Sequence, residues 1–145
     1  MKKFLVFLMG ALFISACYAD DDKPIQPNQL PEKAQQIIND NFPGDPVLYA
    51  TRESEAFEST TYDVRLKSGT ELDFDAAGDW LNIDTAPREV PDALVPQGVL
   101  SYVQDNYPDL SIVKIDRDRR DYEVELNNDM ELVFDLSGKF LRLDY

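Results

Sequence analysis

An internal repeat limits the folds that this chain can adopt. Two alternating segments in its first half return sixty residues later with the same polar and apolar positions: Tyr62-Asp63-Val64-Arg65-Leu66 matches Tyr122-Glu123-Val124-Glu125-Leu126, and Glu71-Leu72-Asp73-Phe74-Asp75 matches Glu131-Leu132-Val133-Phe134-Asp135. Upstream, Asp40-Asn41-Phe42-Pro43 matches Asp105-Asn106-Tyr107-Pro108 at an offset of sixty-five. The change of offset places five extra residues in the first copy, within Ser54–Thr61. The chain is therefore expected to contain the same supersecondary unit twice.

Each copy predicts one helix followed by four strands. Apolar residues recur at helical spacing at Leu30, Ala34, Ile37, Ile38 and Phe42, and again at Val95, Val99, Tyr102, Val103 and Tyr107. Prolines suit the starts of both helices and force their ends: Pro31, Pro96, Pro43 and Pro108. The expected strands are Val47–Glu53, Thr61–Lys67, Thr70–Asp75 and Trp80–Asp84, then Ile112–Asp118, Tyr122–Asn127, Met130–Asp135 and Phe140–Tyr145.

The predicted fold is α+β, with two tandem helix-plus-four-strand antiparallel repeats that form one continuous sheet and carry both helices on one face. A single copy of about 50 residues buries too little apolar surface to be comfortable alone, which favours a shared sheet. The expected organisation is a signal peptide (1–19), a flexible acidic tether (20–28), a first repeat (29–84), a linker (85–91) and a second repeat (92–145).

The first nineteen residues have the layout of an export signal. Lys2 and Lys3 precede an apolar run, Phe4–Ile14, that is too short for a permanent membrane span. Ordinary signal peptidase would cut before Asp20, whereas Ile14-Ser15-Ala16-Cys17 has the form of a bacterial lipobox. We favour lipid attachment at Cys17, the only cysteine of the chain. The expected location is the periplasm, the outer membrane through that anchor, or the cell surface.

The charge balance indicates which partners are favoured. The chain has a formal net charge of −14, and residues 1–19 hold two lysines and no acids, so their removal leaves −16. Such a surface repels nucleic acid and anionic lipid headgroups and favours a cationic protein or peptide on encounter. We therefore expect no nucleic-acid partner, and membrane contact only through a lipid at Cys17.

The residue types present leave few routes to catalysis. The chain has no histidine, and Cys17 lies in the export signal, which argues against Ser-His-Asp sites, Cys-His sites and histidine-bearing zinc sites. No glycine-rich phosphate loop is present, so no catalytic residue, cofactor or metal is expected. Two acidic groups, Asp73/Asp75/Asp79 and Asp116/Asp118/Asp121, have the closely spaced oxygens that calcium uses, but Asp75 and Asp135 are better explained as turn formers ahead of Gly78 and Gly138.

A binding surface is predicted on the polar side of the sheet. Strict alternation turns one set of strand residues toward the helices: Val64, Leu66, Leu72, Phe74, Leu81 and Ile83. It turns another set away from them: Asp63, Arg65, Lys67, Glu71, Asp73, Trp80 and Asn82, with Glu123, Glu125, Glu131, Val133, Phe140 and Arg142 in the second copy. Exposed aromatics are typical anchors, so Trp80 and Phe140 would centre the site, beside Arg65, Asn82 and Arg142, with Phe57 in a flanking wall. The alternative is that both aromatics cap the sheet edge or pack under a loop.

A motif shared by both copies resembles a known family. Phe74-Asp75-Ala76-Ala77-Gly78-Asp79-Trp80-Leu81 and Phe134-Asp135-Leu136-Ser137-Gly138-Lys139-Phe140-Leu141 follow the pattern Phe-Asp-x-x-Gly-x-aromatic-Leu, after a helix and strands. In this order they resemble the PepSY-like proteins grouped as beta-lactamase-inhibitor-like. The resemblance implies an exported α+β protein whose concave sheet holds a partner without catalysis. A beta-lactamase target does not carry over, because the disulfides of the inhibitor have no counterpart here.

The expected function is an exported, non-enzymatic module that binds a protein or peptide, of which an inhibitor of an extracytoplasmic enzyme is one form. Two alternatives stay open: a structural or envelope-accessory lipoprotein, and a sensor domain for a small molecule or cation.

Overall fold

The computed structural model describes residues 22–54 and 59–144, which form two helices, two short 3₁₀ turns and nine strands. The helical elements are η1 (Pro27–Gln29), α1 (Glu32–Asn41), η2 (Asp92–Leu94) and α2 (Gln97–Asn106). The strands are β1 (Lys23–Ile25), β2 (Val47–Glu53), β3 (Thr61–Leu66), β4 (Glu71–Asp75), β5 (Trp80–Asp84), β6 (Ile112–Arg117), β7 (Asp121–Leu126), β8 (Glu131–Asp135) and β9 (Phe140–Asp144). The signal segment, Cys17 and Phe57 lie outside the described residues.

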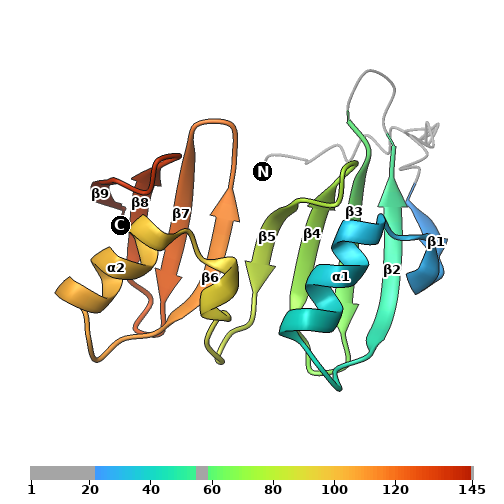
Figure 1. Cartoon of the computed structure of the whole chain (residues 1–145), viewed down its shortest axis with the longest axis horizontal. Helices are drawn as coiled ribbons and strands as arrows, with labels where there is room; N and C mark the ends of the chain where they lie inside the picture. Colours follow the sequence, from blue (N-terminus) through green and yellow to red (C-terminus); the bar gives the residue numbers. More distant parts are fainter. Residues whose placement is uncertain (1–21, 55–58, 145) are drawn as a thin grey trace, which may run out of the picture.

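All nine strands belong to one antiparallel sheet in which the spatial order equals the chain order, β1 to β9 (Figure 1). The two halves of the chain meet between β5 and β6, where Asn82 lies opposite Asp116, Ile83 opposite Ile115 and Asp84 opposite Lys114. The prediction of an α+β protein with an antiparallel sheet is confirmed.

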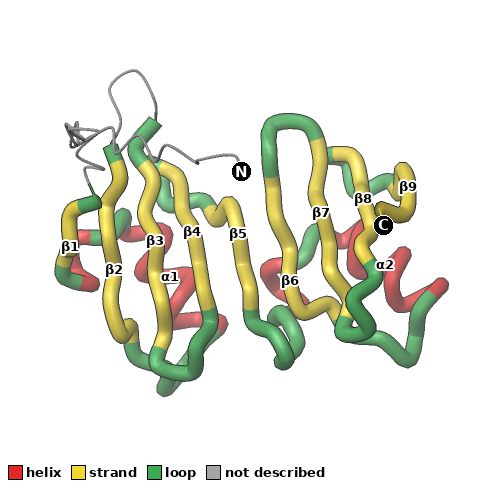
Figure 2. The backbone as a smooth tube through the Cα atoms, turned by 180° about the vertical axis from the view of Figure 1, so that it is seen from behind, coloured by secondary structure: helices red, strands yellow, loops and turns green. Residues whose placement is uncertain are grey.

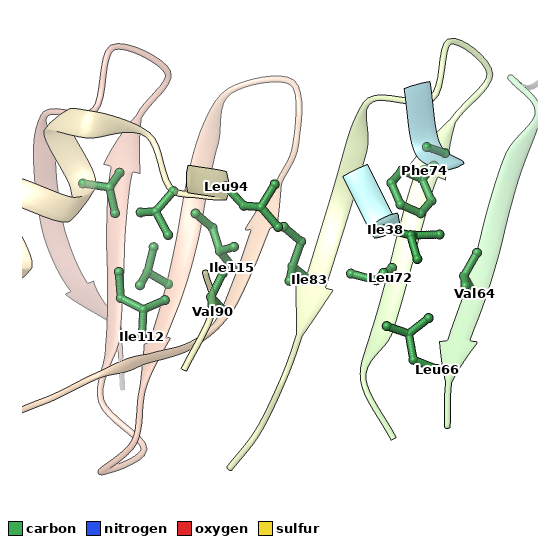
Figure 3. Packing of buried hydrophobic residues seen from close by; sticks show 14 of the residues in the cluster. Ile38, Val64, Leu66, Leu72, Phe74, Ile83, Val90, Leu94, Ile112 and Ile115 are labelled. Atoms are coloured by element: carbon green, nitrogen blue, oxygen red, sulfur yellow. The ribbon is translucent and has the colours of Figure 1, made fainter. Parts of the chain in front are cut away.

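The helices and the core define two different sides of the sheet. Both helices are drawn in front of the strands in Figure 1, and the strands lie in front of both helices in Figure 2. Buried residues of α1, α2 and the strands form one apolar cluster (Figure 3). Fully buried members include Phe74, Phe134, Leu66, Leu72, Ile83, Ile115, Leu126 and Leu132. We call the side of the sheet away from the helices the open face.

The helices begin and end where the sequence predicts. Pro31 and Pro96 occupy the positions just before α1 and α2, where no N–H is needed. The helical pattern also identifies the buried side: Ala34 and Ile38 of α1, and Val99 and Val103 of α2, are buried.

The expected tether is wrong for the part that the structure describes. Residues 23–25 form β1, which pairs with β2 by placing Lys23 opposite Arg52 and Ile25 opposite Ala50. Without β1, the outer edge of β2 would present backbone N–H and C=O groups that lack a partner strand. β1 supplies that partner, and its Ile25 packs against the core. The acidic composition of the segment predicted a flexible tether, and its single aliphatic residue, Ile25, was too weak a signal to predict a strand.

The linker is packed rather than free. Thr85 and Val90 donate their backbone N–H groups to the carbonyls of Val113 and Ile112, at 2.9 and 2.8 Å. The Thr85 hydroxyl also donates to the Arg88 carbonyl at 2.8 Å, and Val90 is only 1% exposed. Residues 85–91 are therefore held against β6 by backbone hydrogen bonds. Within the described part of the chain, no helix is both long enough and apolar enough to cross a bilayer.

Candidate functional site: the acidic open face

A row of polar side chains crosses the open face at right angles to the strands. The pairing of β3 to β7 places five residues directly opposite one another in turn: Asp63, Asp73, Asn82, Asp116 and Glu123. Their neighbours along the strands, such as Val64, Leu72 and Ile115, are buried on the helix side. Because successive strand residues point to opposite faces, the five point to the open face. We call them the acidic row.

The carboxylates of the acidic row are held at raised pKa values. Burial, followed by the charge of Asp63, raises the pKa of Asp73 from its ordinary 3.8 to about 6. Burial is also the largest cause of the raised pKa values of Asp63, Asp116 and Glu123. Neighbouring acids add to it at each of these three positions, for example Asp121 beside Glu123. The negatively charged forms of these carboxylates are therefore destabilised, and a cation bound beside them would stabilise those forms.

Three cations of the open face pair with neighbouring acids among the described residues. Lys114 lies 3.5 Å from Asp116, and Arg65 forms an ion pair with Glu71. Arg142 pairs with Asp144 at 3.7 Å. The pKa of Asp116 remains raised despite Lys114, so that lysine does not fully offset its burial.

Asn82 stands at the centre of the row with one free acceptor. Its side chain donates a hydrogen bond to Asp73, which lowers the pKa of that carboxyl in part. Its Oδ1 is buried and has no hydrogen-bond partner among the described residues. A buried acceptor without a donor costs free energy, so a donor supplied by a partner would be favourable here.

Two shallow hollows adjoin at Asp73. The first has a volume of about 230 Å³ and is lined by Tyr49, Asp63, Val64, Arg65, Glu71 and Asp73. The second has a volume of about 270 Å³ and is lined by Asp73, Leu81, Asn82, Asp116, Arg117, Asp118, Asp121 and Glu123. Together they leave the central part of the acidic row accessible from solvent.

Three of the predicted site residues lie on the open face: Arg65 opposite Glu71, Asn82 opposite Asp73, and Arg142 opposite Val133. Sequence reasoning did not assign Asp116 to this surface. Its place in the row depends on the pairing of β5 with β6, in which Asn82 lies opposite a residue thirty-four positions later in the chain.

The placement of Trp80 and Phe140 on the open face is wrong. Asp73 pairs with Asn82 but Phe74 pairs with Trp80, so Leu81 is an extra residue in a β-bulge. The same shift pairs Val133 with Arg142 and Phe134 with Phe140. The bulge turns both aromatics to the helix side, where they pack against the core. It also removes Leu81 from the inward set, in which it was expected.

The sequence contained a signal for these bulges. Trp80, Leu81 and Ile83 are all apolar, and strict alternation cannot bury Trp80 and Ile83 on one side. One extra residue between them resolves the conflict. Leu141, the equivalent of Leu81, is 48% exposed, as an unpaired bulge residue can be.

The turn that precedes each bulge follows the prediction. The Asp75 carboxylate accepts N–H bonds from Ala77 and Asp79 at 3.0 and 2.9 Å, and Gly78 has φ +85°. Asp135 accepts from Ser137 and Lys139 at 2.9 and 3.0 Å, and these contacts, with the Ser137 hydroxyl first, lower its pKa. Among the residues that the structure describes, no three potential acidic ligands converge on a metal site.

Comparisons with known proteins agree with this architecture. The family model described as "Putative beta-lactamase-inhibitor-like, PepSY-like" matches residues 60–142. A solved structure described as a putative periplasmic protein of the DUF2874 family from Bacteroides vulgatus is 42% identical, with a TM-score of 0.83 over 88% of this chain and 99% of that one. No curated protein matches the chain.

Two further solved structures are similar over nearly their whole length. One, from Bacteroides thetaiotaomicron, is described as a putative calcium-regulated periplasmic protein and is 42% identical, with a TM-score of 0.82 over 88% of this chain and 99% of that one. Another from Bacteroides vulgatus, described as a putative periplasmic protein of unknown function, is 38% identical, with a TM-score of 0.81 over 86% of this chain and 99% of that one. Neither the family nor any of these three structures is described as an enzyme, and the periplasmic relatives support export. The alternating strands, the paired Asp-x-x-Gly turns and the matched residues 60–142 together show that this chain belongs to the PepSY-like, beta-lactamase-inhibitor-like family.

Proposed function

We propose that this protein is an exported, non-enzymatic module that binds a cationic protein or peptide across its open face. In this proposal the two halves are tandem repeats whose helices share one side, which leaves the other side free for a partner. The observation that carries it is the acidic row, in which the pairing of β3 to β7 aligns four carboxylates with Asn82 across the open face. Burial raises the pKa values of all four carboxylates. A lysine or arginine placed over the row would lower those pKa values again and so gain binding free energy.

The size of the row suggests the length of the segment that fits it. From Asp63 in β3 to Glu123 in β7 the row crosses four strand spacings. At ~4.8 Å each they span roughly 19 Å, the reach of about six residues of an extended peptide. An extended segment with basic side chains on one face is therefore the simplest ligand, whether it is free or part of an enzyme that the module inhibits.

The test uses octalysine as the probe and octaglutamate as its control in isothermal titration calorimetry. Octalysine should bind, and the affinity should fall with rising salt because the charges are partly screened. Asp73→Asn combined with Asp116→Asn should weaken binding at least ~10-fold, since two charges at the centre of the row are lost. Asp105→Asn with Asp109→Asn removes two exposed charges at the end of α2 and is the matched control. Equal weakening by both pairs would mean that only net charge attracts the probe.

Calcium binding is the second candidate, because one relative is described as calcium-regulated and every residue of the acidic row carries at least one side-chain oxygen. The described acids do not converge as a metal requires, so calcium would have to draw Asp73, Asp116 and the free Asn82 Oδ1 together. Titration with calcium and with magnesium, each alone, separates the candidates. Calcium-selective binding that also blocks octalysine would favour the sensor, whereas weak binding of either ion leaves the peptide-binding function.

Lipid attachment at Cys17 belongs to the same proposal, and the periplasmic relatives support the export that it requires. Cys17→Ser should release the protein from membranes into the soluble fraction. Intact mass spectrometry of the native protein should show a lipidated chain that begins at Cys17, and an unmodified chain that begins at Asp20 would contradict the anchor.

A further inference from the structure

The outer edge of β9, the last strand of the sheet, corresponds to the edge with which β5 pairs in the first half. β5 ends the first half, and its outer edge pairs with β6. β9 ends the second half at the end of the sheet, and among residues 22–54 and 59–144 no strand pairs with its outer edge. Figure 1 shows β9 at one end of the row of strands and β5 in the middle.

The two strands are built alike. Both follow an Asp-x-x-Gly turn, and both contain the same register shift, which pairs Phe74 with Trp80 and Phe134 with Phe140. After the bulge, Asn82-Ile83-Asp84 in β5 corresponds to Arg142-Leu143-Asp144 in β9. The β5–β6 joint therefore shows what an antiparallel partner of β9 needs.

Side-chain pairs at the β5–β6 joint define that requirement. Asp84 lies opposite the cation Lys114, and Ile83 lies opposite Ile115 with both side chains 0% exposed. A strand that suits β9 must place a cation opposite Asp144 and an aliphatic residue opposite Leu143. Opposite Arg142 it should place an acid.

β9 itself meets all three needs. We propose that β9 pairs with β9 of a second copy of this chain, antiparallel and centred on Leu143. Arg142 of each copy then lies opposite Asp144 of the other, which gives two symmetric Arg–Asp pairs. The two Leu143 side chains meet on the helix side. A contact in which the same patch serves both copies is the rule for two-fold dimers.

Charges around Asp144 favour this pairing. In β8, Glu131 lies directly opposite Asp144, and like charges at such positions are unfavourable. Among the described residues, the cation that pairs with Asp144 is Arg142 of its own strand, at 3.7 Å, and both side chains are more than half exposed. A second copy brings another arginine to the far side of Asp144.

The other end of the sheet limits growth to two copies. β1 covers β2 there with only three residues, and one of them is Pro24, which cannot donate a ladder hydrogen bond. Short edge strands with proline resist further pairing, so assembly closes at the dimer. A two-fold axis normal to the sheet keeps each face on its own side, which makes the two open faces continuous.

Sedimentation velocity of the purified chain over a concentration series tests the proposal, with circular dichroism to verify folding. The chain should approach twice its monomer mass at protein concentrations on the order of 100 μM, more completely at 0.3 M salt, where repulsion between acidic copies is screened. Arg142→Asp places acids opposite each other at both symmetric contacts and should weaken the dimer at least ~10-fold.

The decisive variant exchanges the two charges. Arg142→Asp combined with Asp144→Arg should restore the dimer, because opposite charges face each other again. Arg119→Asp changes charge to the same extent at an exposed residue of the β6–β7 turn and should leave assembly unchanged. A monomeric wild-type chain throughout the series would overturn the proposal, as would a dimer that is indifferent to Arg142→Asp or one that the exchange does not restore.

Discussion

The two halves of the molecule place the same aromatic position in different surroundings. Phe140 stacks on Tyr102 of α2, with ring centroids 4.5 Å apart and an angle of 9° between the planes. Trp80 instead lies 6.0 Å from the ring of Tyr122 in β7, and the Arg117 guanidinium sits 5.5 Å above its centroid. Phe140 therefore serves its own half, whereas Trp80 joins the two halves.

Two neighbours explain the difference. The residue of α1 equivalent to Tyr102 is Ile37, which offers no ring for stacking. β5 has β6 and β7 beyond it, whereas β9 ends the sheet, so only Trp80 has a second half to contact. The repeated motif thus determines the backbone conformation and the side of the sheet to which the aromatic residue points. The elements adjacent to each copy determine which residues that side chain contacts.

The largest effect should come from the position at which both halves agree. Phe74 and Phe134 are each 0% exposed, so Phe74→Ala and Phe134→Ala should each lower the free energy of unfolding by about 3–5 kcal/mol. Urea titration followed by circular dichroism measures both. A loss below about 1 kcal/mol at one of them would show that the halves do not share a common core position.

The aromatic pair itself should separate the halves. Phe140→Ala should cost about 2 kcal/mol, less than a fully buried phenylalanine, because its ring is partly exposed. A double-mutant cycle of Phe140→Ala with Tyr102→Ala should give a coupling of about 0.5–1.5 kcal/mol. The matched cycle of Trp80→Ala with Tyr102→Ala should give none, while Trp80→Ala with Tyr122→Ala should. Equal coupling of Trp80 to Tyr102 would contradict the assignment.

Replacing Gly98 of α2 by alanine should lower stability, although the same change within most helices raises it. Gly→Ala within a helix usually stabilises by about 0.5–1 kcal/mol. At Gly98, however, a Cβ would lie 2.8 Å from the carbonyl oxygen of Gly138, which is backbone and cannot move aside easily. Gly98→Ala should therefore destabilise by about 1 kcal/mol. In α1 the equivalent residue is Lys33, which already carries a Cβ, so Lys33→Ala should change the melting temperature little. A more stable Gly98→Ala variant would show that the α2 contact is looser than the structure indicates.

The smallest expected effect depends on pH. Asp73 corresponds to Val133 of the second half, and its pKa is raised to about 6. The folded state then holds this proton more tightly than the unfolded chain, so Asp73 disfavours folding above pH 6 and this penalty disappears as the pH falls toward 4. Asp73→Asn should raise the free energy of unfolding at pH 7 by on the order of 1 kcal/mol after solvent screening, and by much less at pH 4. A constant benefit of Asp73→Asn at all pH values would show that the burial of its charge is not the cause.

Local patterns predicted most of the fold because each element carries its own signal. The bounds of β2 and β5 equal the expected ones, with the turn glycines Gly44 and Gly78 ahead of them, and the alternation of polar and apolar residues marks β3 and β4 between them. The inward residues Val64, Leu72 and Phe74 follow from the same alternation. The bulges at Leu81 and Leu141 interrupt it, which is why the predicted anchors face the wrong side.

What the sequence did not reveal depends on contacts between distant segments. β1 exists because β2 needs a partner, and a single residue, Ile25, marks it. The acidic row is complete only when Asp116 of β6 lies beside Asn82 of β5, and no local pattern encodes that pairing. The sequence shows that the acidic residues are present, but it does not predict that they lie opposite one another across neighbouring strands.

Binding of a cationic partner by the acidic row, as proposed, can be followed residue by residue in amide NMR spectra of the isotope-labelled protein titrated with octalysine. The backbone amides of Asp63, Asp73, Asn82, Asp116 and Glu123 should shift together and saturate with one apparent dissociation constant. The amides of the exposed acids Asp105 and Asp109 should stay nearly unchanged. Shifts that spread evenly over all exposed acids, or that gather around Trp80, would contradict this claim.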